Sequence, residues 1–463
     1  MLPIPVLMAV KIGLEVHGYL NVGSGVKLFC DCSLGEAEPN MNICPVCTAM
    51  PGSKPMLPNR EAVEKVIAIS GMLDCRINSR LLFQRKHYSW PDLPSGYQRT
   101  MSGSYSVPVG EGGSFLGIGI ADVHLEEDPA RWEPGTGCVD YNRSGFPLVE
   151  IVTNPDFSSS GDVRVWLRRL VTALSYISAI DADAGIKSDV NVSISPDFRR
   201  VEVKNVNSFR SIIRAIEFEV RRQEALVKGG KRVEQETRAW DDAAGVTVFM
   251  RRKEQAMDYM FIPEPDLPAV SLDVGSIKSV VGALPERPAV KVEKYVRMGV
   301  DSVDAEVLSS EILLAEMFEK VAKEVSTVLA ARWFRRELLR VLNYNDRSLD
   351  ELELDEKHMI QLLKLVESGK ITDETAKKIL EMLVESPFDV VKYVEKEGLS
   401  AVSDASVLEG YCKEAISENK KAVGDYRAGN EGALNFIVGS VMRKSEGKAV
   451  PQEVRGIIER LLR

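Results

Sequence analysis

Short apolar runs alternate with turn residues in the first part of the chain, to about residue 290. Residues 10–17 alternate between apolar and polar with a period of two, which predicts a strand whose polar side chains share one face. Similar patterns predict strands at 115–123 and 148–152, and a hairpin of 190–195 with 201–206 around Pro196-Asp197. The first part of the chain is therefore expected to contain a sheet.

Helices are predicted between these strands. Residues 59–72 and 160–177 have apolar residues near helical spacing, with Asn59 and Ser160 as candidate N-caps. A third helix is predicted over 208–229, where a pair of glycines ends it. Because strands and helices mix without a regular βαβ alternation, the sequence predicts an α+β fold with a mainly antiparallel sheet.

The pattern changes after about residue 290. Proline-rich stretches at 261–268 and 284–288 predict a linker, and amphipathic helices are then predicted over 308–328, 330–342, 355–368 and 372–386. A last helical segment begins near residue 404. A single core stops growing at about 250–300 residues. We therefore predict three domains: a mixed domain at 1–290, an all-α helical domain at 291–405 and a small helical tail domain at 406–463.

Composition and charge narrow the function classes. The net charge of −9 excludes a protein coated in positive charge, although local basic patches can still bind nucleic acid. No window reaches the roughly 18 apolar residues of a membrane span, so no membrane partner is expected. The apolar start, residues 1–10, is short and is interrupted by Lys11, which favours a first strand over a secretory signal. A cytoplasmic location is expected.

Four of the seven cysteines lie close together in the sequence, as Cys30, Cys32, Cys44 and Cys47. A C-x-C pair followed by a C-x2-C pair lets two tight turns complete one tetrahedral site. Four sulfur ligands in a reducing compartment favour zinc, and four protein ligands leave no open position. The pattern predicts a structural zinc ion; the alternative is four unlinked thiols.

Acids and histidines gather in three of the predicted strand regions. Glu15 and His17 are two apart and so share a strand face, His124 precedes the acidic run Glu126-Glu127-Asp128, and Glu150 lies inside an apolar strand. Oxygen ligands with an occasional histidine suit magnesium, which in turn suits phosphoryl transfer from a nucleotide. The alternative is a set of exposed acids on loops.

Two loops could hold a nucleotide or substrate. Residues 85–98 combine cations, aromatic rings, prolines and a glycine, although a rigid turn with packed aromatics explains them as well. Residues 204–210 offer amides, a hydroxyl and two cations just before a helix N-terminus, which suits anions. No G-x4-G-K-[ST] motif is present, so a nucleotide site here is not a P-loop.

Basic residues concentrate in the last segment. Most charge runs are solvated helix faces, but this concentration against an acidic average favours phosphate contact. The predicted nucleic-acid contacts are Lys420, Lys421, Arg427, Arg443 and Lys444.

These motifs together resemble one family, the B subunit of glutamyl/aspartyl-tRNA amidotransferase. The resemblance runs in order from residue 12 to about 450. It rests on residues 12–17, the four cysteines, 91–98, 124–128, 143–151, 191–193, 203–210, 263–268 and 425–435. Residues 129–131 (Pro-Ala-Arg) and 188–190 (Ser-Asp-Val) depart from the pattern of the family.

The resemblance implies a catalytic cradle similar to glutamine synthetase in fold, a helical domain and a tail that meets tRNA. It implies that ATP and Mg²⁺ phosphorylate the side-chain carboxylate of misacylated Glu-tRNA(Gln) or Asp-tRNA(Asn), and that ammonia then gives the amide. The implied partners are an amidase, the A subunit, which makes ammonia from glutamine, and a small C subunit.

The resemblance also implies roles for individual residues. The catalytic residues would be Glu15, His17, Glu126, Glu127 and Glu150, and the Mg²⁺ ligands would be Glu15, His17, Glu126 and Glu150. ATP or substrate would contact Lys86, Tyr88, Asn205 and Ser208. Zn²⁺ would be bound by Cys30, Cys32, Cys44 and Cys47. Two other readings remain: a zinc-stabilised RNA-binding protein without enzymatic activity, and a metal-dependent hydrolase.

Overall fold

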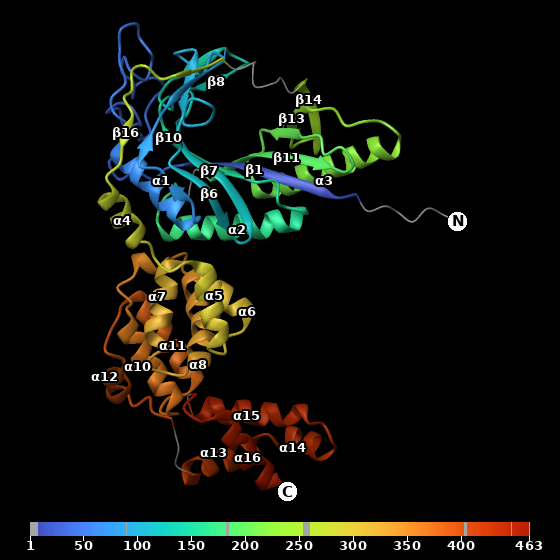
Figure 1. The fold of residues 1–463 in the computed structure, drawn as a ribbon. Helices are drawn as coiled ribbons and strands as arrows, with labels where there is room; N and C mark the ends of the chain where they lie inside the picture. The colour runs from blue at the N-terminus through green and yellow to red at the C-terminus, as the bar shows by residue number, and fades with distance from the viewer. Residues whose placement is uncertain are drawn as a thin grey trace. The chain divides into compact units, whose positions relative to one another are not determined.

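The computed structural model describes residues 8–88, 90–181, 185–252, 260–401, 405–445 and 447–462. The chain divides into two compact units, Met1–Arg287 and Pro288–Arg463 (Figure 1). The first unit is built on a mostly antiparallel sheet and the second is helical, so the predicted α+β class is confirmed. The division into three domains stays a prediction. The predicted first strand begins at Val10, and residues 1–7 of the apolar start lie outside the described residues.

A 12-stranded sheet forms the centre of the first unit, and its main path runs β14-β13-β12-β11-β1-β10-β7-β5-β4-β15. Neighbours along this path are antiparallel except β12 and β13, which are parallel. The strands of this path are β1 Val10–Tyr19, β4 Gln84–His87, β5 Tyr97–Thr100, β7 Ile118–Glu127, β10 Pro147–Thr153, β11 Ile186–Ile194, β12 Val201–Lys204, β13 Glu236–Asp241, β14 Val246–Arg252 and β15 Met260–Pro263.

Shorter strands complete the unit. β2 (Arg76–Ile77) and β6 (Gly110–Phe115) extend the sheet at β7, while β3 (Arg80–Leu81) pairs with β16 (Val270–Ser271) and β8 (Arg131–Glu133) pairs with β9 (Cys138–Asp140). These short pairs surround the main sheet with loop-rich segments.

The two faces of the sheet differ in polarity because side chains alternate along each strand. In β1, Ile12, Leu14 and Val16 are buried in the apolar core, whereas Glu15 and His17 lie on the other face. Three helices, α1 (Arg60–Met72), α2 (Ser160–Tyr176) and α3 (Phe209–Lys228), pack on the apolar side (Figure 1). The opposite face is left for polar side chains.

The helix starts follow the expected capping chemistry, with one correction. The Asn59 side chain accepts the backbone N–H groups of Glu61 and Ala62, as predicted. The cap of α2 is Ser159 and not Ser160: the Ser159 backbone is extended and its hydroxyl accepts the N–H of Asp162. Two consecutive serines offer the same chemistry, and only the backbone conformation distinguishes them.

Two predicted boundaries in this unit are wrong. The strand predicted at 115–123 is a hairpin, because the chain turns at Leu116-Gly117, where both residues have positive φ, between β6 and β7. The stretch 261–268 is not wholly a linker, because β15 pairs with β4 and so joins the sheet. Proline at 263 is tolerated because it ends an edge strand, where a backbone donor is not needed.

The second unit consists of helices with two apolar cores. One core includes Trp333, Phe334 and Leu362, and the other includes Leu408 and Ile437. The helix predicted over 308–328 is wrong: α7 begins at Ile312 and ends at Val321, and α8 begins at Thr327, because the backbone of Ser326 leaves the helical conformation at the N-cap of α8. No helix within the described ranges is long and apolar enough to cross a membrane.

The α-helices of the remaining chain are α4 Val274–Gly282, α5 Pro288–Arg297, α6 Ser302–Leu308, α7 Ile312–Val321, α8 Thr327–Trp333, α9 Leu339–Tyr344, α10 Glu356–Glu367, α11 Asp373–Glu385, α12 Val390–Lys396, α13 Ala405–Glu418, α14 Lys420–Arg427, α15 Gly432–Lys444 and α16 Pro451–Leu462. The predicted helices at 355–368 and 372–386 correspond to α10 and α11. The segment predicted at 330–342 is covered by α8, a π-helical turn at Phe334–Leu338 and α9.

Candidate active site and zinc centre

The polar face of the sheet brings residues from distant parts of the sequence together. In the strand register, His17 of β1 lies opposite Glu150 of β10, and Glu150 lies opposite His124 of β7. Glu126, two residues after His124, shares their face. The hydrogen-bonded order β1-β10-β7 therefore creates a cluster of two histidines and two carboxylates.

In this cluster His124 forms hydrogen bonds, whereas His17 lies farther from its neighbouring carboxylates. His124 Nε2 lies 3.1 Å from Glu150 Oε2, and His124 Nδ1 lies 2.6 Å from Asp122 Oδ1, so both ring nitrogens of His124 are engaged. His17 Nδ1 lies 3.7 Å from Glu126 Oε1 and 4.0 Å from Glu150 Oε2, and this atom is buried with no hydrogen-bond partner among the described residues. Those two separations are too long for hydrogen bonds.

A second group of acids lies beside the first on the same face. Glu15 of β1, Asp189 of β11 and Glu202 of β12 offer oxygens within 4.8 Å of one another. Lys204 forms ion pairs with Asp189 and with Glu202, at 3.1 Å for the latter, and the Asn191 amide donates to Glu15 at 3.0 Å. The Lys204 ammonium therefore neutralises much of the charge of this second group.

The pKa values of these groups reflect burial and mutual charge. Burial alone would lower the pKa of His17, but the carboxylates of Glu150 and Glu126 raise it to about 9. Burial raises the pKa of Glu15, and the charge of Glu150 adds to the effect. Glu150 shows the opposite: burial would raise its pKa, yet His124 and His17 hold it well below the usual range.

The first group fits a magnesium ion better than the second. Ligands around Mg²⁺ at about 2.1 Å lie roughly 3–4 Å from one another, which matches the spacing of His17 Nδ1 from Glu126 and Glu150. The unpartnered Nδ1 of His17 is a suitable ligand atom in its neutral form. In the second group the ammonium of Lys204 already pairs with two of the three acids.

A cavity of about 230 Å³ opens on this face. Its walls combine acidic, basic and amide groups: His17, Glu126, Asp128, Lys187, Asp189, Gln98, Asn205 and Asn207, with Tyr19, Pro129, Leu148, Gly185, Ser188 and Val206. Asp128 is held in place by the Tyr19 hydroxyl, which donates at 2.6 Å, and by Arg143 Nε at 3.0 Å. Charged and amide groups converging in one cavity are typical of a catalytic or binding site.

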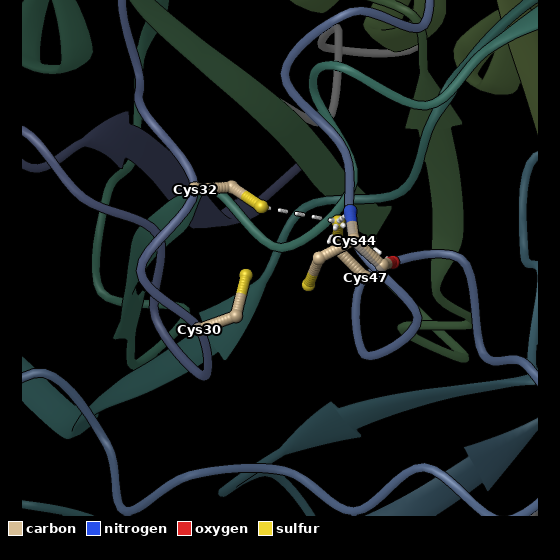
Figure 2. A group of neighbouring side chains, drawn as sticks. All are labelled: Cys30, Cys32, Cys44 and Cys47. Carbon is tan, nitrogen blue, oxygen red and sulfur yellow. Dashed lines mark hydrogen bonds between the residues drawn. The ribbon is translucent and has the colours of Figure 1, made fainter.

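The four predicted zinc ligands meet between two loops (Figure 2). Their sulfur atoms all lie within 4.8 Å of one another, and Cys47 Sγ is 3.9 Å from both Cys32 Sγ and Cys44 Sγ. Sulfurs in a tetrahedral site with Zn–S bonds of about 2.3 Å are roughly 3.8 Å apart. The hydrogen bond with Cys30, the N–H of Cys44 and the charge of Lys27 lower the pKa of Cys47 to about 4, although burial opposes them. The arrangement fits one zinc ion.

Comparison with known proteins decides the family. The family described as "GatB/GatE catalytic domain" matches residues 10–278, and the one described as "GatB domain" matches residues 316–462. The B subunit of the aspartyl/glutamyl-tRNA(Asn/Gln) amidotransferase of Methanococcus aeolicus is 43% identical over 98% of this chain and 99% of its own length. The chain belongs to the amidotransferase B-subunit family.

Other members of the family are similarly close. The B subunit of Methanothermobacter thermautotrophicus is 44% identical, covering 97% of this chain and 99% of its own length. That of Methanopyrus kandleri is 43% identical over 98% of both chains. The match therefore spans both compact units, and the predicted resemblance is confirmed.

One residue predicted for the active site of this amidotransferase lies elsewhere. Glu127 is one residue beyond Glu126 and so points to the opposite face of β7, where its carboxylate accepts from Arg99 at 3.1 Å. Burial raises the pKa of Glu127 despite that arginine. The structure therefore separates Glu127 from the cluster that the sequence predicts.

Arg99 belongs to a buried ion-pair network around Glu264, whose side chain is fully buried. Glu264 accepts from Arg85 at 2.7 Å and from Arg99 at 3.2 Å, and Arg85 also pairs with Asp266 at 2.8 Å. The acids of the proline-rich stretch thus attach it to the β4–β5 hairpin.

Of the four predicted ATP or substrate contacts, one lines the cavity and three do not. Asn205, with φ of 64°, lines the cavity. Ser208 does not line it; its hydroxyl caps α3 by accepting the N–H of Ser211. Lys86 lies on β4 opposite Gln98, close enough for its charge to lower the pKa of Glu150, and Tyr88 follows that strand. Neither Lys86 nor Tyr88 lines the cavity.

The predicted nucleic-acid contacts lie on the last helices of the second unit. Lys420, Lys421 and Arg427 are exposed on α14, and Arg443 is exposed near the end of α15. Lys444 instead pairs with Glu418 at 2.8 Å and with Glu414 at 3.4 Å on α13. The structure thus leaves four of these five cations turned toward solvent.

Asp189 and Glu202 are site residues that the sequence motifs do not single out, whereas Lys204 is one of the two cations of the predicted loop 204–210. The signal for Asp189 is a period-two alternation of polar residues that extends the predicted hairpin by one residue and puts Asp189 and Asn191 on one face of β11. The sequence does not show that β1 lies between β10 and β11, and this pairing brings the polar face of β11 beside Glu15.

Proposed function

We propose that this chain activates the side-chain carboxylate of the aminoacyl group on misacylated Glu-tRNA(Gln) or Asp-tRNA(Asn). ATP phosphorylates that carboxylate, and ammonia then displaces phosphate to give the amide. The observation that carries the proposal is the polar face, where His17, Glu126 and Glu150 converge beside a cavity. Membership of the family, whose members are named for amidation on these tRNAs, supports it.

The chemistry needs an acyl phosphate because a carboxylate is a poor electrophile. A carboxylate oxygen attacks the terminal phosphorus of ATP, ADP leaves, and ammonia then attacks the acyl carbon, so that phosphate leaves and a proton is released. A Mg²⁺ ion, when bound, neutralises charge on the transferring phosphoryl group. His17, Glu126 and Glu150 would hold that ion through one nitrogen and carboxylate oxygens.

Other residues that line the cavity serve binding, and Glu15, beside the cavity residues on the same face, serves proton transfer. Lys187 presents a cation toward phosphate oxygens, and the amides of Gln98 and Asn205 can orient polar substrate groups. Glu15 lies next to the first group, and its raised pKa suits a carboxylate that accepts the proton released by ammonia. Each of these groups comes from a different strand or loop around the cavity.

Partners complete the proposed reaction. An amidase, the A subunit, supplies ammonia from glutamine, a small C subunit joins the assembly, and the exposed cations of α14 and α15 contact tRNA. The four cysteines hold a structural zinc ion, since a site with four protein ligands has no position left for substrate.

The test is an assay of ATP hydrolysis and amide formation with misacylated Glu-tRNA(Gln), Mg²⁺ and ammonium chloride, which replaces the amidase as nitrogen source. We expect ADP and Gln-tRNA(Gln) to form only with charged tRNA present. The same assay is repeated in the presence of the amidase. Absence of turnover in both, with tRNA still bound, would favour the RNA-binding protein without enzymatic activity. Hydrolysis that is independent of tRNA would favour the hydrolase.

A further inference from the structure

A groove lined by arginines lies between α2 and α3, on the helical side of the sheet. Its volume is about 540 Å³, and its charged walls are Arg164 and Arg168 of α2 and Arg210 and Arg214 of α3. Phe209, which is 39% exposed, lies among them, and Leu167, Ile213 and Glu217 complete the lining. This basic groove belongs to a protein whose net charge is −9.

Ion pairs among the described residues account for only one of the four arginines, Arg214. All four are exposed. Arg214 reaches Asp242 at 3.6 Å and stacks over Trp240, with 5.5 Å between the guanidinium carbon and the ring centroid. For Arg164, Arg168 and Arg210, no carboxylate among the described residues comes within ion-pair distance.

The spacing of these cations puts like charges next to each other, and only one carboxylate, that of Glu217, is among the residues that line the groove. Arg164 and Arg168 are four residues apart on α2, and Arg210 and Arg214 are four apart on α3, so each helix presents two neighbouring like charges. Like charges at this spacing destabilise a helix. A bound polyanion reverses that effect, and guanidinium groups suit phosphate because they donate in a fixed fork.

The start of α3 links the rim of the catalytic cavity, on the polar face of the sheet, to the groove on the helical side. Asn205 and Asn207 line the cavity, while Phe209 and Arg210 line the groove, so residues 205–210 connect the two. Three residues span at most about 11 Å, which places Arg210 within that distance of Asn207 along the chain. A nucleic-acid strand that leaves the cavity and passes around the start of α3 therefore reaches Arg210 first and then the other arginines of the groove.

We propose that this groove binds the sugar-phosphate backbone of the tRNA acceptor end while its aminoacylated 3′ terminus occupies the cavity. The identity of the RNA rests on the function proposed above; the phosphate-binding assignment rests on the arginines. Phe209 offers a face on which a base can stack, which favours RNA over an acidic protein surface. Guanidinium groups facing phosphates contribute a binding energy that falls as salt rises.

The test compares two sets of variants of the full chain. The first combines Arg164→Gln, Arg168→Gln and Arg210→Gln. The second combines Arg60→Gln, Arg76→Gln and Arg232→Gln, which removes the same charge from exposed, ion-paired arginines of the same unit. Binding of an RNA minihelix with the acceptor stem and single-stranded 3′ end is measured from about 50 to about 300 mM salt. Thermal unfolding checks that both sets fold.

The groove variant is expected to lower the slope of log Kd against log salt by about 2. Each phosphate interaction that is removed lowers this slope by ~0.7–0.9. Its affinity at about 0.1 M salt falls on the order of 100-fold, and the control set stays close to wild type. An Arg→Lys version of the groove set retains most of the slope.

Equal slopes for the groove and control sets would overturn the proposal. So would unchanged RNA binding with loss of the amidase from the groove variant, because the groove would then bind a protein. Amidation is measured separately on the wild-type chain. A wild type that binds the minihelix through the arginines but forms no amide would refute the proposed function and leave this inference standing.

Discussion

Glu150 shows how one residue takes its properties from its strand neighbours. It lies inside β10 between two strands that each present a histidine, and those histidines hold its pKa below the usual range despite burial. A carboxylate kept ionised next to the unpartnered Nδ1 of His17 is a ready cation ligand.

We predict that Glu150→Gln lowers the rate of ATP-dependent amidation by about 100-fold or more, because it removes a charge that acts on the transferring phosphoryl group. Binding of tRNA is expected to stay unchanged, since the residue lies deep in the cluster. The measurement is steady-state amidation together with tRNA affinity. Glu64→Gln, which neutralises a half-buried acid on α1 that pairs with Arg60 outside the cluster, is the control. Amidation at the wild-type rate in Glu150→Gln would remove Glu150 from the site.

Glu264 belongs to the proline-rich stretch 261–268, and its role in the structure is to stabilise buried ion pairs. Its carboxylate is fully buried and accepts from both Arg85 and Arg99. Removing one partner of a buried ion pair leaves the other charge without compensation.

We predict that Glu264→Ala destabilises the first unit by about 3–5 kcal/mol, because two largely buried guanidinium groups lose their shared carboxylate. Asp266→Ala is the matched control. Asp266 is more exposed and pairs with Arg85 and Lys54, so a much smaller loss is expected. The free energy of unfolding of both variants is measured by chemical denaturation. Similar losses for the two would mean that burial of Glu264 is not what matters.

At the scale of elements, alternation along strands predicts much of the polar face. The pattern at 10–17 correctly puts Glu15 and His17 on one face, and the polar residues of the hairpin fall on the same face of the sheet. Helices with distinct caps, such as the one begun by Asn59, are also found where expected.

Other features depend on information that a local pattern lacks. Glu126 and Glu127 are chemically alike, and only the register of β7 against β10 decides which of them meets Glu150. The turn at Leu116-Gly117 interrupts a run that is apolar on both sides. The pairing of β15 with β4 joins segments more than 170 residues apart.

The zinc loops are a separate element, held to the sheet by polar contacts. The buried Lys27 ammonium donates to the carbonyls of Asn42 and Tyr141, and the Ser144 hydroxyl donates to that of Cys47. Apolar side chains such as Met41 and Met50 remain exposed there, so the loops have little core of their own.

We predict that Cys47→Ser, or removal of zinc by a chelator, unfolds residues 30–53 locally and leaves α2 and α3 intact. The reason is that a loop segment without an apolar core depends on its metal for stability. Metal analysis of the wild type should give one zinc per chain, and hydrogen exchange should rise within 30–53 only. Cys75→Ser, at a cysteine outside the cluster, is the control. Unchanged exchange after complete metal removal would contradict a structural zinc.

At the scale of the whole molecule, the last four helices form their own apolar core. Leu408, Ile437 and Ile458 pack together there, separately from the core around Trp333 and Phe334. A segment with its own core can be removed with limited damage to the rest.

We predict that deleting the chain from residue 405 onward weakens binding of full-length tRNA and reduces its salt dependence, because exposed cations of α14 and α15 are lost. The more specific variant replaces Lys420, Lys421, Arg427 and Arg443 with Gln. Each phosphate interaction that is removed lowers the slope of log Kd against log salt by about 0.9. Lys444→Gln is the control, because Lys444 already pairs with Glu414 and Glu418. Equal affinity before and after the deletion would refute a role of the tail in tRNA binding.

The late position of β15 has a consequence for how the protein is made. Arg85 forms ion pairs with two carboxylates, those of Glu264 and Asp266, which lie just after β15 near the end of the first unit. The sheet also pairs β1 with β11, whose paired residues lie 168–184 positions apart in the sequence. A ribosome must therefore synthesise residue 266 before the β4 edge of the sheet can close. Until then the nascent chain carries an unsatisfied arginine and an open strand edge, which is the period in which chaperones are most needed.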